Sequence, residues 1–196
     1  MIVIVGGANT KLTGENVRKA EDEIKDSAAV VTTLELGLDT VKVAMETGRK
    51  HGVTTILNAA PGRADLDQEI LQNVDILVVN ETEAEMLAGC SDLGKCGEIL
   101  RKICRTVVIT LGEKGAMLWE KDEPVAKVDC PHIAKEKVVD TTGAGDAFVG
   151  SLATFIAAGG SVGESVRRGC QVASLTVTRP GTQASYPTAG DISDIV

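Results

Sequence analysis

One stretch decides the fold prediction: Val138-Val139-Asp140-Thr141-Thr142-Gly143-Ala144-Gly145-Asp146-Ala147-Phe148-Val149-Gly150. It leads from a β-branched run through small residues and an aspartate into a nearly all-apolar helix. Gly-Ala-Gly at a helix start leaves backbone N–H groups bare, and with the helix dipole these form an anion hole suited to phosphate charge. Asp146 in the same turn could accept a proton from a hydroxyl group. The alternative is an ordinary buried helix with Asp146 or Thr142 as its N-cap.

In the rest of the chain, short β-branched runs alternate with longer amphipathic segments. Strands are expected at Ile2–Val5, Ala29–Leu34, Thr54–Asn58, Asp75–Val79, Val107–Leu111, Ala116–Trp119 and Val125–Asp129. Helices are expected at Glu15–Lys25, Leu38–His51, Leu66–Asn73, Glu81–Ala88, Leu93–Cys104, Asp146–Ala158 and Val162–Thr178. This alternation is typical of an α/β fold with a mostly parallel sheet. No repeat or linker divides the chain, so we expect one domain over residues 1–196.

Composition excludes several classes of protein. The 196 residues carry a net charge of −8 and are 43% hydrophobic, which is enough for a core. Aromatic residues make up only 2% of the chain, so neither a stacking platform nor a basic stripe for nucleic acid is present. No apolar run approaches the roughly 20 residues that cross a bilayer. The start lacks the basic segment of a signal peptide, and the five cysteines form no C-x-x-C pair. We expect a cytoplasmic protein with reduced thiols that binds neither nucleic acid nor membrane.

A second motif, Asn80-Glu81-Thr82-Glu83-Ala84-Glu85, directly follows a predicted strand. Carboxylates at the carboxyl end of a strand could hold Mg²⁺ through water, with Asn80 as a neutral partner. The same spacing is also a capping box, with Asn80 as N-cap and Glu83 three residues later. Both interpretations can hold at once.

A third motif, Thr110-Leu111-Gly112-Glu113-Lys114-Gly115, ends another predicted strand. Its glycines could let a nucleotide lie against the backbone, or the segment could be a turn into the next strand. The sequence contains no P-loop and no G-x-G-x-x-G. His51 and His132 are isolated, so a hydrolase triad is poorly supported.

Together, DTTGAGDAFVG (140–150), NETEAE (80–85) and TLGEKG (110–115) resemble the ribokinase-like (PfkB) carbohydrate kinase family in order and spacing. NAAPGRADL (58–66) and VTRPGTQASYP (177–187) extend the resemblance over essentially the whole chain. It implies a three-layer α/β/α sandwich with a mostly parallel central sheet. It also implies an enzyme that transfers the γ-phosphoryl group of ATP to the 5-hydroxyl of D-ribose, with Mg²⁺ and K⁺ as cofactors.

The resemblance also implies roles for individual residues. Asp146 would deprotonate the sugar hydroxyl, with an anion hole formed by Gly143, Ala144 and Gly145. Asn80 and Glu83 would organise Mg²⁺ and phosphate, and the nucleotide would be lined by Thr110, Gly112, Gly115 and, near the adenine, Cys170, where relatives usually have Asn or His. The K⁺ site would be formed by Asp140, Thr142 and the backbone near Val177, Gly181 and Ser185.

Family members carry further residues before the point that corresponds to Met1. These hold the first strands, a lid and a G-G-K-G-x-N stretch that grips the sugar. We therefore expect the nucleotide-binding two-thirds of the fold, truncated at its N-terminus. Two alternatives stay open: a non-catalytic nucleotide-binding fragment from an incomplete gene model, and a fructose or nucleoside kinase of the same family. The Asn58–Gly62 segment favours ribose, and a homodimer is one of the oligomeric states that the sequence allows.

Overall fold

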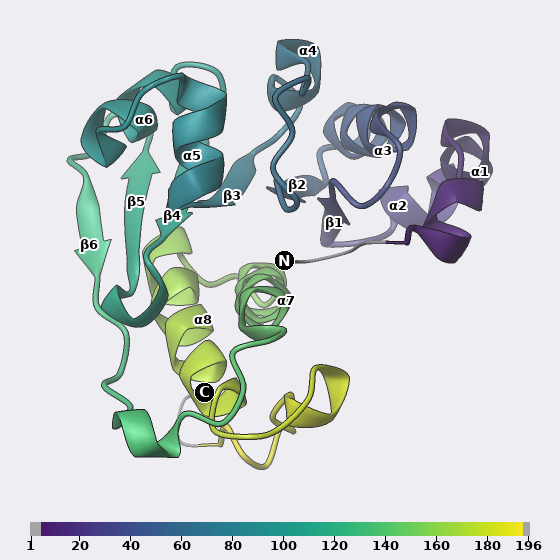
Figure 1. Cartoon of the computed structure of the whole chain (residues 1–196). Coiled ribbons are helices and arrows are strands. Elements are labelled where there is room, and N and C mark those ends of the chain that lie inside the picture. The colour runs from purple at the N-terminus through teal and green to yellow at the C-terminus, as the bar shows by residue number, and fades with distance from the viewer. Residues whose placement is uncertain (1–4, 194–196) are drawn as a thin grey trace. The chain divides into compact units, whose positions relative to one another are not determined.

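The computed structural model describes residues 5–193 (Figure 1). Its strands form one six-stranded sheet in the order β1-β2-β3-β4-β5-β6. The chain folds into two compact units. The first runs to Ile109 and includes Trp119–Pro124; the second comprises Thr110–Leu118 and the chain from Val125 onward. The prediction of one domain over residues 1–196 stays a prediction.

The strands of the first unit confirm the expected parallel sheet. They are β1 (Ala29–Thr33), β2 (Thr54–Asn58), β3 (Ile76–Asn80) and β4 (Thr106–Thr110), the last residue of which is assigned to the second unit. The β1–β2 and β2–β3 pairs are parallel. The four apolar residues of β3 and the first four residues of β4 are all buried, as expected for strands that are covered on both faces.

Three helical segments of the first unit precede β1, and the other four connect its strands. They are the 3₁₀ turn η1 (Gly7–Lys11), α1 (Gly14–Lys19), α2 (Glu21–Lys25), α3 (Leu38–His51), α4 (Gln68–Leu71), α5 (Glu81–Ala88) and α6 (Leu93–Leu100). The bounds of α3 and α5 are those predicted. Both helices end at a glycine in the left-handed region, Gly52 (φ 71°) and Gly89 (φ 68°), a conformation that side chains disfavour.

Several expected elements differ from the structure; the helix expected at Leu66–Asn73, for example, is only the four residues of α4 (Gln68–Leu71). The single helix Glu15–Lys25 is two helices, because the chain turns at Ala20 (φ −99°, ψ 21°) and each half packs separately against α3. The helix expected to reach Cys104 ends at Leu100. Beyond it the backbone makes hydrogen bonds that span three residues, such as Ile103 N–H to the Leu100 carbonyl at 2.9 Å. The strand Ile2–Val5 lies outside the described residues except for Val5, which is in neither a helix nor a strand.

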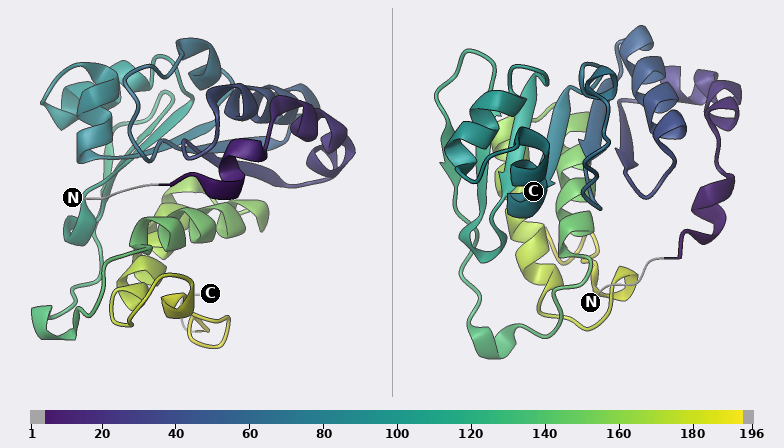
Figure 2. Two further views of the ribbon diagram at one scale, coloured as in Figure 1. Left: turned by 45° about the vertical axis from the view of Figure 1, so that its right-hand side comes forward. Right: turned by 45° about the horizontal axis from the view of Figure 1, so that its top comes forward.

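The second unit holds an antiparallel strand pair and two long helices. Strand β5 (Ala116–Glu120), whose last two residues are assigned to the first unit, pairs with β6 (Ala126–Val128). Helices α7 (Ala144–Ala157) and α8 (Val162–Thr176) lie side by side in the views of Figures 1 and 2. Short 3₁₀ turns complete this unit: η2 (Gly112–Lys114), η3 (Lys135–Lys137) and η4 (Gln183–Ser185). No helix within residues 5–193 is long and apolar enough to cross a membrane.

The packing of Trp119 against α6 gives a test of the first unit. A Cβ atom on Gly97 would overlap the indole ring of Trp119, which is 1% exposed. We expect Gly97→Ala to lower the free energy of unfolding by about 1–3 kcal/mol, because a rigid buried ring cannot move aside. The measurement is urea unfolding followed by far-UV circular dichroism.

The matched control is Gly150→Ala in α7, where an added Cβ meets nothing within 4 Å. This variant should keep or raise stability by up to about 1 kcal/mol, through better helix propensity. Equal destabilisation by both substitutions would contradict the packing argument.

Candidate functional site

The start of α7 is open, without a capping side chain. Its N-cap is Gly143, in the left-handed region at φ 80°, and no side chain accepts a hydrogen bond from the first turn. Ala144 N–H makes a long bond of 3.3 Å to the Thr141 carbonyl, while the amides of Gly145 and Asp146 have no acceptor within residues 5–193. The alternative prediction, that Asp146 or Thr142 caps this helix, is therefore wrong. The helix start presents free N–H groups beside an exposed carboxylate, as an anion site requires.

Tyr186 lies over this helix start, a contact that the sequence analysis missed. A Cβ atom on Gly143 would sit 3.0 Å from the Tyr186 hydroxyl and 3.1 Å from its ring. Burial, and to a lesser degree the nearby Asp146 carboxylate, raise the pKa of the Tyr186 phenol. The tyrosine is 40 residues from Asp146 in sequence, so no local pattern indicates the contact.

The Asp140 carboxylate joins two loops beside α7. One oxygen accepts Thr142 N–H at 2.9 Å and the other accepts Gly181 N–H at 3.1 Å. Hydrogen bonds from Thr142, then from Gly181, hold the pKa of Asp140 below its usual range, so it stays negatively charged. The carbonyl of Val177 accepts Val139 N–H at 2.8 Å, which anchors the same two loops a second time.

Ser185 follows Gly181 in the same loop. It lies in η4, fully buried, and its hydroxyl donates to the Thr182 carbonyl at 2.6 Å. Hydrogen bonds of the second unit therefore connect Asp140, Thr142, Val177 and Gly181, four of the residues proposed for cation binding, whereas the Ser185 hydroxyl bonds to Thr182. Carboxylate, hydroxyl and carbonyl oxygens fit a hard monovalent cation.

Of the two interpretations of the Thr110–Gly115 segment, the turn is confirmed, because the chain forms the 3₁₀ turn η2 between β4 and β5. Its 3₁₀ turn η2 is closed by Leu111 N–H to the Gly115 carbonyl at 2.8 Å. Gly112, at φ 57°, has nothing within 4 Å of an added Cβ, and its carbonyl accepts Gly115 N–H at 3.1 Å. A Cβ on Gly115 would overlap the Val128 carbonyl, so that glycine is required by the chain packed against it.

Cys170 is connected to the same turn by Cys130, which contacts both. The Cys130 Sγ is 3.5 Å from the Cys170 carbonyl and 3.0 Å from the Ser174 hydroxyl. A Cβ on Gly115 would be 2.8 Å from Cys130 N, so the chain at Cys130 separates the glycine turn from α8. Contact with the Cys130 thiol, then burial, raises the pKa of Cys170, which therefore keeps its proton.

In the first unit, Asn80 and Glu83 form the capping box at the start of α5. Asn80 Oδ1 accepts Glu83 N–H at 2.8 Å, and Glu83 Oε2 accepts Asn80 N–H at 2.9 Å. Glu83 is 6% exposed, and an added Cβ on Gly62 would be 3.1 Å from its Cγ. The loop from Asn58 therefore packs against Glu83. The capping interpretation is confirmed, and Glu83 keeps a second carboxylate oxygen outside the box.

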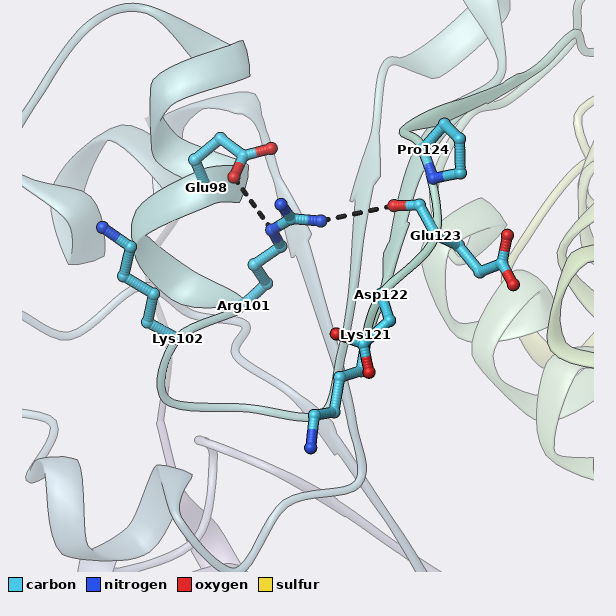
Figure 3. A pocket seen from close by; sticks show the side chains of 7 residues that line it. All are labelled: Glu98, Arg101, Lys102, Lys121, Asp122, Glu123 and Pro124. Carbon is cyan, nitrogen blue, oxygen red and sulfur yellow. Dashed lines mark hydrogen bonds and ion pairs between the residues drawn. The ribbon is translucent and has the colours of Figure 1, made fainter.

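A surface pocket of the first unit contains none of the predicted site residues (Figure 3). Arg101 lies at its centre, paired with Glu98 at 2.8 Å and donating to the Glu123 carbonyl at 3.3 Å. The rest of the lining is Lys102, Lys121, Asp122 and Pro124. Within residues 5–193, no group of three or more His, Cys, Asp or Glu side chains is arranged to hold a metal ion.

Fold and geometry define an α/β protein with an uncapped helix start beside an exposed carboxylate. Residues 1–189 match the model of the pfkB family carbohydrate kinases. The chain belongs to this family.

Individual relatives show this similarity in more detail. The chain is 40% identical over 202 residues to a ribokinase of Mus musculus, covering 98% of this chain and 61% of that protein. It is 36% identical to a deoxyribokinase of Salmonella typhi, covering 95% and 61%. The solved Arabidopsis thaliana ribokinase complexed with ribose and ATP matches with a TM-score of 0.89 and 29% identity, covering 100% of this chain and 64% of that one. The expected ribokinase-like fold is confirmed, and the chain spans about three-fifths of the length of these curated relatives.

The capping box predicts an unusual pH dependence of stability. Burial raises the pKa of Glu83, against the opposing effect of its hydrogen bonds with Asn80. The folded-state pKa then lies above the unfolded one, so stability present at low pH is lost as pH rises through the folded pKa. We expect Glu83→Gln, which keeps the capping acceptor, to lose less stability than the parent chain between about pH 4 and pH 7.

Unfolding free energies across this pH range provide the measurement. Glu85→Gln, at an exposed position of the same helix, is the control and should keep the parent slope. An unchanged slope in Glu83→Gln would show that Glu83 does not cause the dependence.

The helix start predicts a strict requirement for glycine at position 143. Gly143→Ala places a Cβ against Tyr186 and forces a side chain into the left-handed region, at a cost of about 1–2 kcal/mol. We expect lower stability and weaker binding of a phosphate-bearing ligand, both measured by thermal shift with and without ATP.

Gly145→Ala is the matched control, since an added Cβ there meets nothing within 4 Å. It should retain the stability of the parent. A Gly143→Ala variant as stable as the parent would show that the left-handed start is not required.

Proposed function

We propose that the chain carries the phosphoryl-transfer site of an ATP-dependent sugar kinase, which moves the γ-phosphoryl group of ATP to the 5-hydroxyl of D-ribose. The open start of α7, with Asp146 in its first turn, is the observation that carries the proposal. Membership of a carbohydrate kinase family supports it, as does the similarity to a ribokinase solved with ribose and ATP.

Phosphoryl transfer needs positioning and charge stabilisation more than covalent chemistry, and this helix start supplies both. The free amides of Gly145 and Asp146, at the positive end of the helix dipole, would stabilise charge on the transferring group. The Asp146 carboxylate would take the proton of the attacking hydroxyl. The left-handed Gly143 keeps this end free of a competing side chain.

The nucleotide is proposed to lie along the second unit. The chain at Gly112, where nothing lies within 4 Å of an added Cβ, would contact it directly, with Thr110 at the end of β4. Gly115 would act by holding the turn against β6. Cys170, neutral and buried on α8, would act from behind Cys130, by packing beneath the part of the chain that meets the base.

Mg²⁺ would be held by Asn80 and Glu83 through water. The two side chains already bond each other's backbone, so the second carboxylate oxygen of Glu83 is the group left to contact a hydrated ion. This fits Mg²⁺, which keeps most of its water and binds by one or two carboxylates and substrate phosphates. When bound, it would neutralise phosphate charge.

K⁺ is proposed to bind the oxygen-rich region around Asp140. The ligands would come from Asp140, Thr142, Val177, Gly181 and Ser185; the hydrogen bonds among the first four support this proposal. A cation here would offset the Asp140 charge, close to the loop that enters α7.

A second substrate, 2-deoxy-D-ribose, is favoured by one observation. The chain is 36% identical to two deoxyribokinases, close to its 40% identity with a ribokinase. The two sugars differ by one hydroxyl, and the site residues described above do not select between them.

We further propose that residues 1–196 act as one domain of a cytoplasmic protein, and that a homodimer is its assembly.

The test is ADP formation by the full chain with Mg·ATP, K⁺ and a panel of ribose, 2-deoxyribose, fructose and adenosine. We expect turnover to depend on ribose or 2-deoxyribose and to fall when Na⁺ replaces K⁺. ATP binding without turnover for any sugar would favour the non-catalytic alternative. Failure to bind ATP, by calorimetry on a folded sample, would overturn the proposal.

Asp146→Asn separates catalysis from binding. We expect turnover to fall by about 10²–10⁴-fold, because the proton acceptor is lost, while the Kd for ATP stays within a few-fold. Asp129→Asn, at an exposed aspartate of the same unit, is the control and should keep full turnover. Loss of ATP binding together with turnover would mean that Asp146 has a structural role.

A further inference from the structure

Two cysteines are in contact where α5 meets α6. The sulfur atoms of Cys90 and Cys96 are 3.1 Å apart, and the Cys96 thiol donates to the Cys90 carbonyl at 3.1 Å. Cys96 is fully buried and Cys90 is partly exposed. Disulfide sulfurs lie about 2.05 Å apart, so an approach of about 1 Å would reach bonding distance.

The fold fixes both sides of this contact. Cys90 follows Gly89, which ends α5 in the left-handed region. Cys96 lies in the first turn of α6, where its N–H bonds the Asp92 carbonyl at 2.8 Å. The next residue, Gly97, packs against the indole ring of Trp119, and this contact holds α6 in position. The two thiols are therefore held together by the native packing of the first unit, not only by their proximity in sequence.

We propose that Cys90 and Cys96 form an oxidisable thiol pair, which closes to an intramolecular disulfide that links the end of α5 to the start of α6. The oxidant is a low-molecular-weight disulfide such as oxidised glutathione. This modification site is independent of the phosphoryl-transfer proposal.

The reaction balances in two exchange steps. The Cys90 thiol loses its proton and its sulfur attacks the small disulfide, forming a mixed disulfide and releasing one small thiolate. The Cys96 sulfur, after losing its proton, attacks Cys90 and expels the second small thiolate. Two cysteine sulfurs are oxidised, one small disulfide is reduced to two thiols, and the two protons end on those thiols.

The surroundings assign the order of attack. Cys90 is the thiol that an oxidant can reach, whereas Cys96 has no exposed surface. Burial, then the Cys90 thiol, raises the pKa of Cys96 to about 11, with Glu85 and Asp92 acting in the same direction. Cys96 is therefore the second, resolving thiol.

The other three cysteines provide internal comparisons. Cys104 is buried and donates to the Leu71 carbonyl at 3.4 Å. Cys130 bonds the Ser174 hydroxyl and lies against Cys170. Because Cys130 and Cys170 form a second thiol contact, the experiment must identify which cysteines pair and not only count the thiols lost.

The test equilibrates the reduced full chain with mixtures of reduced and oxidised glutathione, in buffer and in urea, followed by acid quenching. We expect the free thiols to fall from five to three at the first oxidation step. Non-reducing peptide mapping should give a Cys90–Cys96 peptide lighter by two hydrogen atoms. The closing equilibrium should be at least about tenfold more favourable in the folded chain than in urea.

Cys90→Ser should abolish this first step, and Cys130→Ser, the matched control, should retain it. Cys90 is the residue of choice for substitution, because its partly exposed side chain tolerates serine better than the buried Cys96. Mapping that shows a different pair closing first, disulfides only between chains, or equal closure in urea would each overturn the proposal.

Discussion

The structure of the candidate site depends on one backbone constraint, the left-handed conformation of Gly143. Because this residue turns the chain into α7 without a side chain, the first amides of the helix are not consumed by a cap. The surrounding contacts are built on that turn. Tyr186 occupies the space that a Cβ would fill, and the Asp140 carboxylate fixes the approaching loop to Gly181. The helix start is therefore held in place by groups beside it while its own polar groups stay available.

Helix α5 of the first unit and helix α7 of the second unit begin in different ways. At the start of α5, Asn80 and Glu83 satisfy each other's backbone, giving a closed and buried helix start. At the start of α7 no side chain caps the first turn. A closed start adds stability and orients a carboxylate, whereas an open start can bind an anion.

Sequence reasoning reached most of the fold because its signals are local. Helix α3 has an amphipathic pattern that ends at Gly52, and β3 and β4 are continuous apolar runs, so their positions follow from neighbouring residues. The capping box and the glycine-rich helix start are likewise local. Contacts between distant segments were not accessible. The break at Ala20 depends on packing against α3, and the approach of Tyr186 to Gly143 depends on the return of the chain after α8. The Cys90–Cys96 contact depends on the turn between two helices.

The boundary between the two units has a consequence for how the chain can be divided. The polypeptide crosses it three times, after Ile109, after Leu118 and after Pro124. Strand β5 begins in one unit and ends in the other, with Trp119 supplying a buried ring to the first. Neither unit is thus a contiguous segment of sequence. A single cut, by a protease or in a gene, therefore leaves at least one unit incomplete, and no single cut separates the two as intact modules.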